Sequence, residues 1–271
     1  MTPSELVKIL DLEQLEEDLF RGDSPKTGWQ RVFGGLVFAQ ALTACTRTAP
    51  DRPAHSAHGF FLRPGDPKFP LIYRVERARD GRSFTTRTCT AIQHGKPIFE
   101  MVASFHAEET GLEHALAMPG VASPQAYPAP LDIEGFKRRP AFTGHEWPME
   151  FVPVEGLDRG HQAIWWRVKE KLPDSQPLHR AVLAYISDLT LLDTALVQHE
   201  RSMFEPEIDP ASLDHAIWFH RPFRADEWIL YYQDSPNATG GRALAHGSLF
   251  DAQGALIATV MQEGLIRIAA L

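Results

Sequence analysis

Two stretches of the chain are apolar at helical spacing, and each is followed by runs typical of β-strands. The first covers residues 34–50, and the second spans Leu178–Leu196, where the central part is apolar on nearly every face. A helix of this kind is buried on all sides. Its apolar part is too short for a membrane span, which needs about 20 residues. We therefore expect two helices enclosed within the protein.

Four strand-like runs lie behind each helix, separated by turn residues such as Asp80-Gly81. The expected strands are Ala57–Leu62, Leu71–Arg79, Ser83–Gln93 and Pro97–His106 in the first half, and Leu213–His220, Trp228–Gln233, Ala243–Phe250 and Ala255–Arg267 in the second. The turn residues repeat at a nearly constant offset, 158 residues for Pro64 and Pro222 and 159 for Gly95 and Gly254. The pattern indicates a duplicated α+β unit in which an antiparallel sheet curves around one helix.

The remaining segments complete the two halves. We expect a short helix over residues 4–12, an extended segment over 17–21 and a short strand at Trp29–Phe33. The second half gains strands at Met149–Glu155 and Gln162–Lys169. Five prolines within residues 107–145 favour a linker that wraps the surface. The Pro- and acid-rich residues 205–210 are expected to form a loop.

Composition narrows the functional classes. The 271 residues carry a net charge of −8, which disfavours non-specific nucleic-acid binding. Cys45 and Cys89 provide neither a disulfide framework nor a metal pattern. The N-terminal residues have neither the h-region of a secretory signal nor the basic character of a transit peptide, so a reducing cytoplasm is expected. The chain contains no nucleophile elbow, P-loop, dinucleotide fingerprint or H-E-x-x-H motif. We therefore expect no metal and no cofactor.

Three polar residues break the apolar pattern of the second half, and the first half has no counterpart for them. Asp188 lies in the second helical run, Ser212 at the start of the next expected strand and Gln262 in the last strand. A buried carboxylate is costly unless it is paired or hydrogen-bonded. The three residues thus suggest one active site per duplicated pair. Alternatively, Asp188 caps a backbone group or is solvated at a helix edge, Ser212 is a turn residue and Gln262 faces solvent.

The sequence resembles the acyl-CoA thioesterase II (TesB) family over nearly its whole length. The resemblance rests on VFGG at 32–35, HSAHGFFLRPGD at 55–66, RDGRSF at 79–84 and PIFEMVASF at 97–105 in the first half. In the second half it rests on SDLTLL at 187–192, SLDHAIWFHRPFRADEW at 212–228 and QEGLIR at 262–267. It implies two tandem hotdog folds that form a pseudo-dimer, with an N-terminal unit at 1–106, a linker at 107–145 and a C-terminal unit at 146–271.

The resemblance also implies hydrolysis of acyl-CoA, with Asp188, Ser212 and Gln262 holding the hydrolytic water. A thioester carbonyl needs an aimed water, a base and donors for the developing oxyanion. The candidate donors are the backbone amides at Gly34 and Gly35, although these glycines could equally serve close packing alone. The acyl chain is expected between the two helices. Further candidate substrate-binding residues are His58, Arg63, Arg82, Arg221 and Arg242. The family pattern has Gln where this chain has Leu36.

Two other functions are compatible with the fold. An enoyl-thioester hydratase would use an Asp–His pair on one helix and the loop after it, but His179 and His199 are each more than two turns from Asp188. A non-enzymatic acyl-CoA-binding protein would need a segment for a partner, and none is recognisable. We expect a homo-oligomer, a dimer or tetramer of such chains, with acyl-CoA as substrate and no nucleic-acid or membrane partner.

Overall fold

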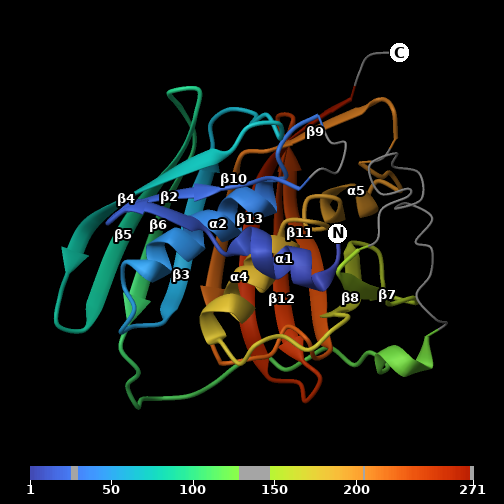
Figure 1. Ribbon diagram of the computed structural model, residues 1–271. Helices are drawn as coiled ribbons and strands as arrows, with labels where there is room; N and C mark the ends of the chain where they lie inside the picture. Colours follow the sequence, from blue (N-terminus) through green and yellow to red (C-terminus); the bar gives the residue numbers. More distant parts are fainter. Residues whose placement is uncertain (26–29, 128–146, 204, 269–271) are drawn as a thin grey trace.

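The computed structural model describes residues 1–25, 30–127, 147–203 and 205–268. In this part of the chain, thirteen strands form one antiparallel sheet with helices on one face (Figure 1). The first half contains α1 (Pro3–Leu10), β1 (Glu13–Glu16), β2 (Leu19–Gly22), α2 (Gly34–Arg47), β3 (Ala54–Phe61), β4 (Leu71–Asp80), β5 (Phe84–Gln93) and β6 (Lys96–His106). The second contains the 3-10 turn η1 (Pro124–Ala126), β7 (Met149–Pro153), β8 (His161–Val168), α4 (Gln176–Ser187), α5 (Thr194–Val197), β9 (Ile208–Ser212), β10 (Asp214–Phe219), β11 (Ile229–Thr239), β12 (Arg242–Asp251) and β13 (Leu256–Ile268).

The strand order is symmetric about the middle of the sheet. It runs β1-β2-β4-β5-β6-β3-β10-β13-β12-β11-β8-β7, and β9 pairs with β13 beside this path. The two halves meet where β3 and β10 lie antiparallel, with His58 opposite Ala216. These two residues are equivalent at the 158-residue offset, so the pseudo-twofold axis passes between them. The expected duplication is therefore visible in the register of the sheet.

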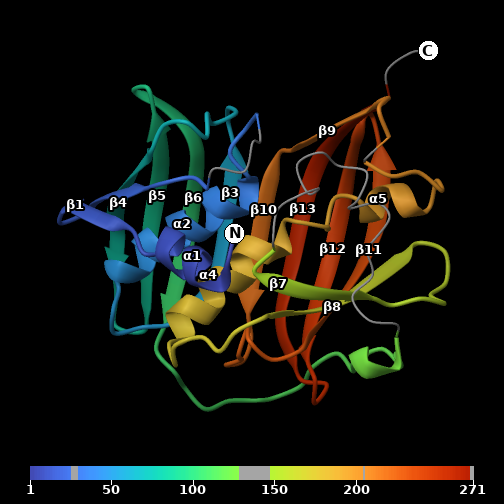
Figure 2. The ribbon, with the colours of Figure 1, turned by 45° about the vertical axis from the view of Figure 1, so that its right-hand side comes forward.

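The register within each half repeats in the same way. Gly59 faces Met101 across β3 and β6, and Ile217 faces Val260 across β10 and β13. Each half is thus an antiparallel sheet curved around one helix, as the sequence predicts. Figure 2 shows α2 and α4 side by side where the two halves meet.

The two central helices are buried because their apolar side chains face both the sheet and each other. Leu36, Phe38 and Leu42 of α2 are almost fully buried, as are most residues of α4. The helices touch at Gly35, where an added Cβ would overlap the Tyr185 carbonyl oxygen. Hence the glycine pair before the first helical run permits close packing of α2 against α4.

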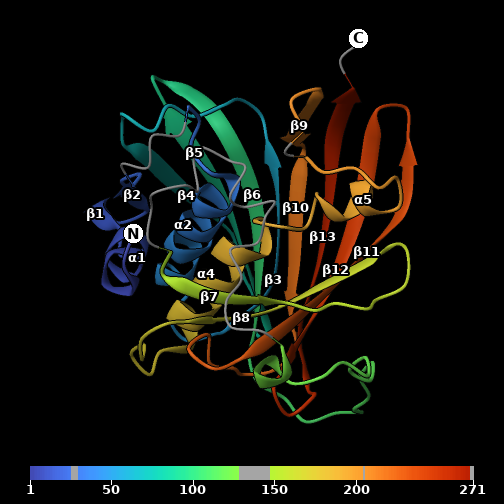
Figure 3. The same cartoon turned by 90° about the vertical axis from the view of Figure 1, so that its right-hand side faces the viewer.

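The outer face of the sheet is covered unevenly. Residues after β6 cross the second half, where the Trp165 indole donates to the Ala122 carbonyl oxygen at 3.0 Å. Met118, Val121 and Tyr127 pack over Val152 and Phe250 on this face. In contrast, Phe60 and Val102 of the first half are 51% and 50% exposed on the central strands. Figure 3 shows the helices α2 and α4 on the opposite side of the sheet.

Three predicted elements differ from the structure. Of the strand predicted at 29–33, residues 30–33 are not a strand, because Phe33 caps the start of α2. Part of the loop predicted at 205–210 belongs to β9, an edge strand that tolerates Pro210. The helix predicted over 178–196 ends at Ser187. Residues 128–145 of the expected linker lie outside the described residues. None of the described helices has the length and hydropathy to cross a membrane.

Candidate active site

Asp188 is the residue that ends α4, not a residue within a longer helix. It is the C-cap, and a turn leads from it to α5. Two side-chain amides fix this turn, because Gln162 donates to the Thr190 carbonyl oxygen at 2.9 Å and Gln233 donates to the Thr190 hydroxyl at 2.7 Å. The apolar run continues past the helix end, which is why helical spacing alone predicts a longer helix. The half-buried Asp188 carboxylate is thereby held at the junction of the two halves.

The structure brings the three polar outliers of the second half together. Gln262, in the middle of β13, donates from Nε2 to Asp188 Oδ1 at 2.6 Å and to Ser212 Oγ at 2.7 Å. Ser212 ends β9 and lies opposite Gly264 of β13, the strand that also carries Gln262. The Gln262 side chain is fully buried, so the alternative in which it faces solvent is wrong. One amide thus ties the carboxylate and the hydroxyl into a single unit.

The N-terminus of α2 approaches this unit. A Cβ added at Gly34 would lie 2.8 Å from Asp188 Oδ2. No side chain caps the helix at Phe33. The first amides of a helix have no intrahelical acceptor and lie at the positive end of its dipole. The Gly34 and Gly35 segment therefore places partial positive charge beside the Asp188 carboxylate, where an oxyanion could be stabilised.

Substitution of the two glycines should have separable effects. Gly34→Ala should leave the melting temperature near that of the wild type and lower by about tenfold the rate of any reaction that depends on Asp188, because the new methyl displaces the Asp188 carboxylate. Gly35→Ala should cost about 2 kcal/mol of folding free energy, because its methyl meets rigid backbone. Thermal unfolding and steady-state kinetics of the pair test this. Equal melting temperatures and equal kcat values in both variants would contradict it.

A cavity of about 350 Å³ adjoins this polar unit, and two arginines, Arg31 and Arg63, line it. Gly34 and Ser212 form its boundary with the polar unit, and Phe61, Ile98 and Phe99 give it an apolar wall. Its lining residues are Arg31, Val32, Gly34, Val37, Phe61, Leu62, Arg63, Pro64, Gly65, Ile98, Phe99, Pro210, Ala211, Ser212 and Leu213. No residue of α4 lines it. A second cavity of about 350 Å³ lies between the ends of α2 and α4, where Thr46, Leu178 and Ala181 line it, so the expected acyl slot between the helices stays a prediction.

The other candidate substrate-binding residues lie in different places. Arg63 lines the cavity and donates to the Pro97 carbonyl oxygen at 2.7 Å. His58 lies on the outer face of the sheet, 2.8 Å from Asp214. Arg221 is the equivalent of Arg63 in the second half, and it donates to the Leu256 carbonyl oxygen, away from the cavity. Arg82 lies on the β4–β5 hairpin, and Arg242 pairs with Glu263 at 3.0 Å. Only Arg63 of this group is brought to the cavity.

Sequence reasoning missed three residues around the site. Arg31 lines the cavity, and its position next to the VFGG motif is the signal that could have found it. Tyr231 donates from its hydroxyl to the Ser187 carbonyl oxygen at 2.7 Å. Burial raises the pKa of Tyr231 well above its usual value, and the Asp188 charge raises it further. The fully buried His215 contacts the Ser187 hydroxyl through Nε2 at 2.8 Å.

The described residues of the first half contain no corresponding polar unit. Thr48 caps α2 where Asp188 caps α4, Ala54 stands in place of Ser212, and Ala103 in place of Gln262. The space is filled from the neighbouring strand, since Arg87 faces Ala103 whereas Ala245 faces Gln262.

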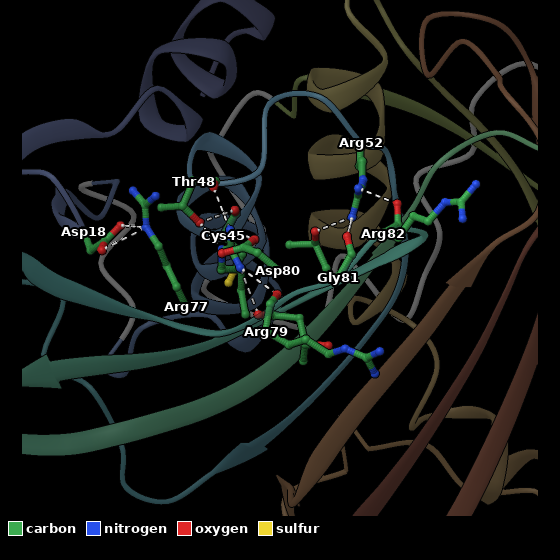
Figure 4. Close-up of polar contacts among 12 residues, drawn as sticks. Asp18, Cys45, Thr48, Arg52, Arg77, Arg79, Asp80, Gly81 and Arg82 are labelled. Carbon is green, nitrogen blue, oxygen red and sulfur yellow. Dashed lines mark hydrogen bonds and ion pairs between the residues drawn. The ribbon is translucent and has the colours of Figure 1, made fainter.

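Arg87 is 2% exposed, and its guanidinium binds the end of α2. It donates to the Thr48 hydroxyl and carbonyl oxygens, both at 3.0 Å, and to Asp80 Oδ1 at 2.7 Å. Figure 4 shows Thr48, Arg79 and Asp80 gathered at this place, with the Arg82 side chain pointing away from them. In the first half, Arg87 therefore occupies the place that corresponds to the polar unit. Among the described residues, the polar unit itself is found in the second half.

No group of three or more His, Cys, Asp or Glu side chains that could hold a metal ion occurs among residues 1–25, 30–127, 147–203 and 205–268.

Comparison with known proteins identifies first the fold and then the family. A hotdog-fold protein of unknown function from Alicyclobacillus acidocaldarius superposes with a TM-score of 0.81 at 18% identity, over 98% of this chain and 99% of that one. Together with the symmetric sheet, this similarity defines two tandem hotdog folds.

Sequence similarity gives the family. The acyl-CoA thioesterase N-terminal domain model matches residues 21–106, and the acyl-CoA thioesterase model matches residues 142–265. Acyl-CoA thioesterase 2 of Haemophilus influenzae is 39% identical, covering 97% of this chain and 96% of that protein. The acyl-CoA thioesterase II TesB2 of Mycobacterium marinum is 43% identical, with a TM-score of 0.84 over 98% and 99% of the two chains. The chain belongs to the acyl-CoA thioesterase II (TesB) family of thioester hydrolases.

Proposed function

We propose that the protein hydrolyses acyl-CoA to a free fatty acid and coenzyme A by direct attack of water, with Asp188, Ser212 and Gln262 as the catalytic residues. The observation that carries this proposal is the Gln262 amide, which bridges the other two residues at 2.6 and 2.7 Å beside an apolar cavity. This adds a residue-level mechanism to the family assignment.

The two carboxylate oxygens of Asp188 have different environments. Oδ1 accepts from Gln262, and Oδ2 faces Gly34 at the start of α2. The Ser212 oxygen also accepts from Gln262, so its own proton is available for a water or for the carboxylate. A water held between Asp188 and Ser212 would therefore lie next to the α2 amides. The base and the oxyanion donors would then both lie within reach of the same thioester carbonyl.

The reaction follows from this placement. Asp188 takes a proton from the water as the water oxygen bonds to the carbonyl carbon. The α2 amides stabilise the oxyanion of the tetrahedral intermediate. The intermediate collapses, the carbon–sulfur bond breaks, and the coenzyme A thiolate leaves and takes up the proton. A thiolate is a good leaving group, so the mechanism needs no strong acid.

The cavity is suited to the coenzyme A side of the thioester. Arg31 and Arg63 line it, and guanidinium groups bind phosphate oxygens through paired hydrogen bonds. The other wall is apolar and ends at Ser212, so the thioester would reach Asp188 from this side. We assign His58, Arg82 and Arg221 no role in binding, because they lie away from this cavity.

Release of free thiol from acyl-CoA tests the function directly. We expect the wild-type protein to release thiol without added metal, with activity that survives a chelator. Ser212→Ala and Gln262→Ala should each lower kcat, by less than the loss of Asp188 itself. The absence of thiol release, or activity that a chelator abolishes and a divalent ion restores, would contradict the proposal.

The hydratase alternative is disfavoured by the position of the nearby histidine. His215 faces the unit, but it is fully buried and its Nε2 contacts Ser187. It therefore lacks the access to substrate that proton transfer to an enoyl thioester requires. An enoyl-CoA absorbance assay run beside the thiol assay separates the two reactions.

We further propose that the protein is a homo-oligomer, a dimer or tetramer, as expected from the sequence. Phe60, Val102 and Trp218 are 51%, 50% and 39% exposed on the central strands β3, β6 and β10. Large apolar side chains exposed on three adjacent central strands support an interface on this face of the sheet. Light scattering should give a mass of at least two chains, and a monomer at all concentrations would contradict this. The boundaries at residues 106 and 146 and the cytoplasmic location stay predictions.

A further inference from the structure

We infer that His215 is a positioning residue that fixes the orientation of the Gln262 amide. The inference rests on the proposed catalytic role of Gln262 and goes beyond the three residues assigned above. It starts from the two ends of that amide, which have different partners.

The nitrogen end of the Gln262 amide is fixed by charge. A carboxylate can only accept hydrogen bonds, so Nε2 must face Asp188, and both of its protons are used by Asp188 and Ser212. The oxygen Oε1 then faces the other way. It is buried and has no partner of standard geometry among the described residues. An unpaired buried carbonyl costs about 1–3 kcal/mol, so a donor is needed on that side.

The ring of His215 supplies that donor. Ala216 faces Met261 across β10 and β13, and one step further along the register His215 meets Gln262. The Nδ1 atom of His215 is likewise buried and without a partner, whereas Nε2 contacts the Ser187 hydroxyl. A side-chain hydrogen bond in which Gln262 accepts from the ring also raises the pKa of His215. We therefore pair Nδ1 with Oε1, since both atoms are buried and neither has another partner.

The protonation state of His215 agrees with this assignment. Burial lowers the pKa of the ring, while the charges of Asp188 and Asp214 raise it and that of His58 lowers it. With burial the largest effect, the ring is neutral near pH 7 and carries one N–H. A proton on Nδ1 pairs with Oε1, and Nε2 then accepts from the Ser187 hydroxyl. In this arrangement the single hydroxyl proton of Ser187 turns to the ring from the Ala184 carbonyl oxygen, which lies 3.0 Å away. A proton on Nε2 would place two acceptors face to face.

The surroundings hold the ring in this orientation. Phe38 packs edge-on against it, with ring centroids 5.0 Å apart and an interplanar angle of 82°. Ser187, which holds Nε2, is the last residue of α4 and is itself fixed by Tyr231. The same chain of contacts thus orients Gln262 and the helix end that carries Asp188.

The duplicated half provides independent support. Where the second half has His215 and Gln262, the first half has Ala57 and Ala103 at the equivalent positions of β3 and β6. The histidine and the glutamine therefore occur together in the half with the polar unit, and both are missing from the other half.

Two substitutions of His215 separate the roles of its nitrogens. Asn carries its amide nitrogen at the position of Nδ1 and can still donate to Gln262. Gln carries its amide at the position of Nε2 and keeps only the contact with Ser187. We expect kcat of His215→Asn within about threefold of wild type, and kcat of His215→Gln lowered about tenfold or more with an unchanged KM, because a misplaced catalytic group slows the chemical step.

A second background shows whether His215 acts through Gln262. In Gln262→Ala protein, the further change His215→Gln should lower kcat by less than about twofold, since the amide it would orient is gone. Melting temperatures are measured for all variants. Equal kcat losses in His215→Asn and His215→Gln would overturn the inference. So would a His215→Gln effect that persists in the Gln262→Ala background, or kcat losses that follow melting temperature. A wild-type protein that releases no thiol would instead overturn the proposed function.

Discussion

Asp188→Asn is expected to yield a folded protein whose kcat for acyl-CoA hydrolysis is lower by about 100-fold or more, the usual scale for a positioned general base. The Asn carbonyl can still accept from Gln262 Nε2 at the position of Oδ1, so the unit keeps its shape. The group that replaces Oδ2 beside Gly34 is an amide, which cannot take a proton from water. The melting temperature should hold or rise, because a half-buried charge is removed.

An acid on the neighbouring strand provides the matched control. Asp209 lies exposed on β9, opposite Arg267 and three residues before Ser212. Asp209→Asn makes the same chemical change without touching the unit, and its kcat should match the wild type. If folded Asp188→Asn protein also turned over acyl-CoA at a near-normal rate, Asp188 would be only the cap of α4.

Arg87→Met is expected to cause the largest loss of stability, about 3 kcal/mol. Methionine fills much of the same space but cannot donate, so the Thr48 and Arg79 carbonyl oxygens lose a buried cationic donor. The cation at the C-terminal end of α2 is also lost. For a chain of this size the melting temperature should fall by roughly 6–12 °C. The kcat of the folded fraction should stay near that of the wild type, because the catalytic unit is in the other half.

Arg82→Met, on the same hairpin, separates this effect from a general cost of removing arginine. The Arg82 side chain is exposed and points away from the cluster (Figure 4). Its removal should change the folding free energy by no more than about 0.5 kcal/mol. Equal melting temperatures for the two variants would show that the hydrogen bonds of Arg87 to the end of α2 do not stabilise the protein.

The duplicated architecture could be predicted from the sequence because its signals are local. Turn residues such as Gly95 and Gly254 recur at a constant offset, and alternation of apolar residues defines the strands between them. The candidate trio could be predicted because the two halves differ. The second half has polar residues at positions where the first half has apolar, core-facing residues, and such a difference points to a function.

The rest depends on contacts between residues far apart in the chain. The turn after Ser187 is held by side-chain amides from β8 and β11, which bond to Thr190 from strands far away in the sequence. The role of Ser212 depends on β9, whose pairing with β13 overrides the low strand propensity of Pro210. The sequence around Arg87 indicates only an exposed strand arginine. Its role depends on its contact with Thr48, the cap of α2, which lies 39 residues away in the sequence. The role of His215 depends on the pairing of β10 with β13, which brings it next to Gln262.

The kinetics of the Asp188→Asn/Gln262→Ala double variant test the central claim most directly, because groups that hold one water do not act additively. The two residues are joined by a 2.6 Å hydrogen bond and would act on the same step. We predict that the double variant has a kcat within about twofold of Asp188→Asn alone. A kcat lowered by the full product of the two single effects would contradict the account, since Gln262 would then act somewhere other than on the water held by Asp188.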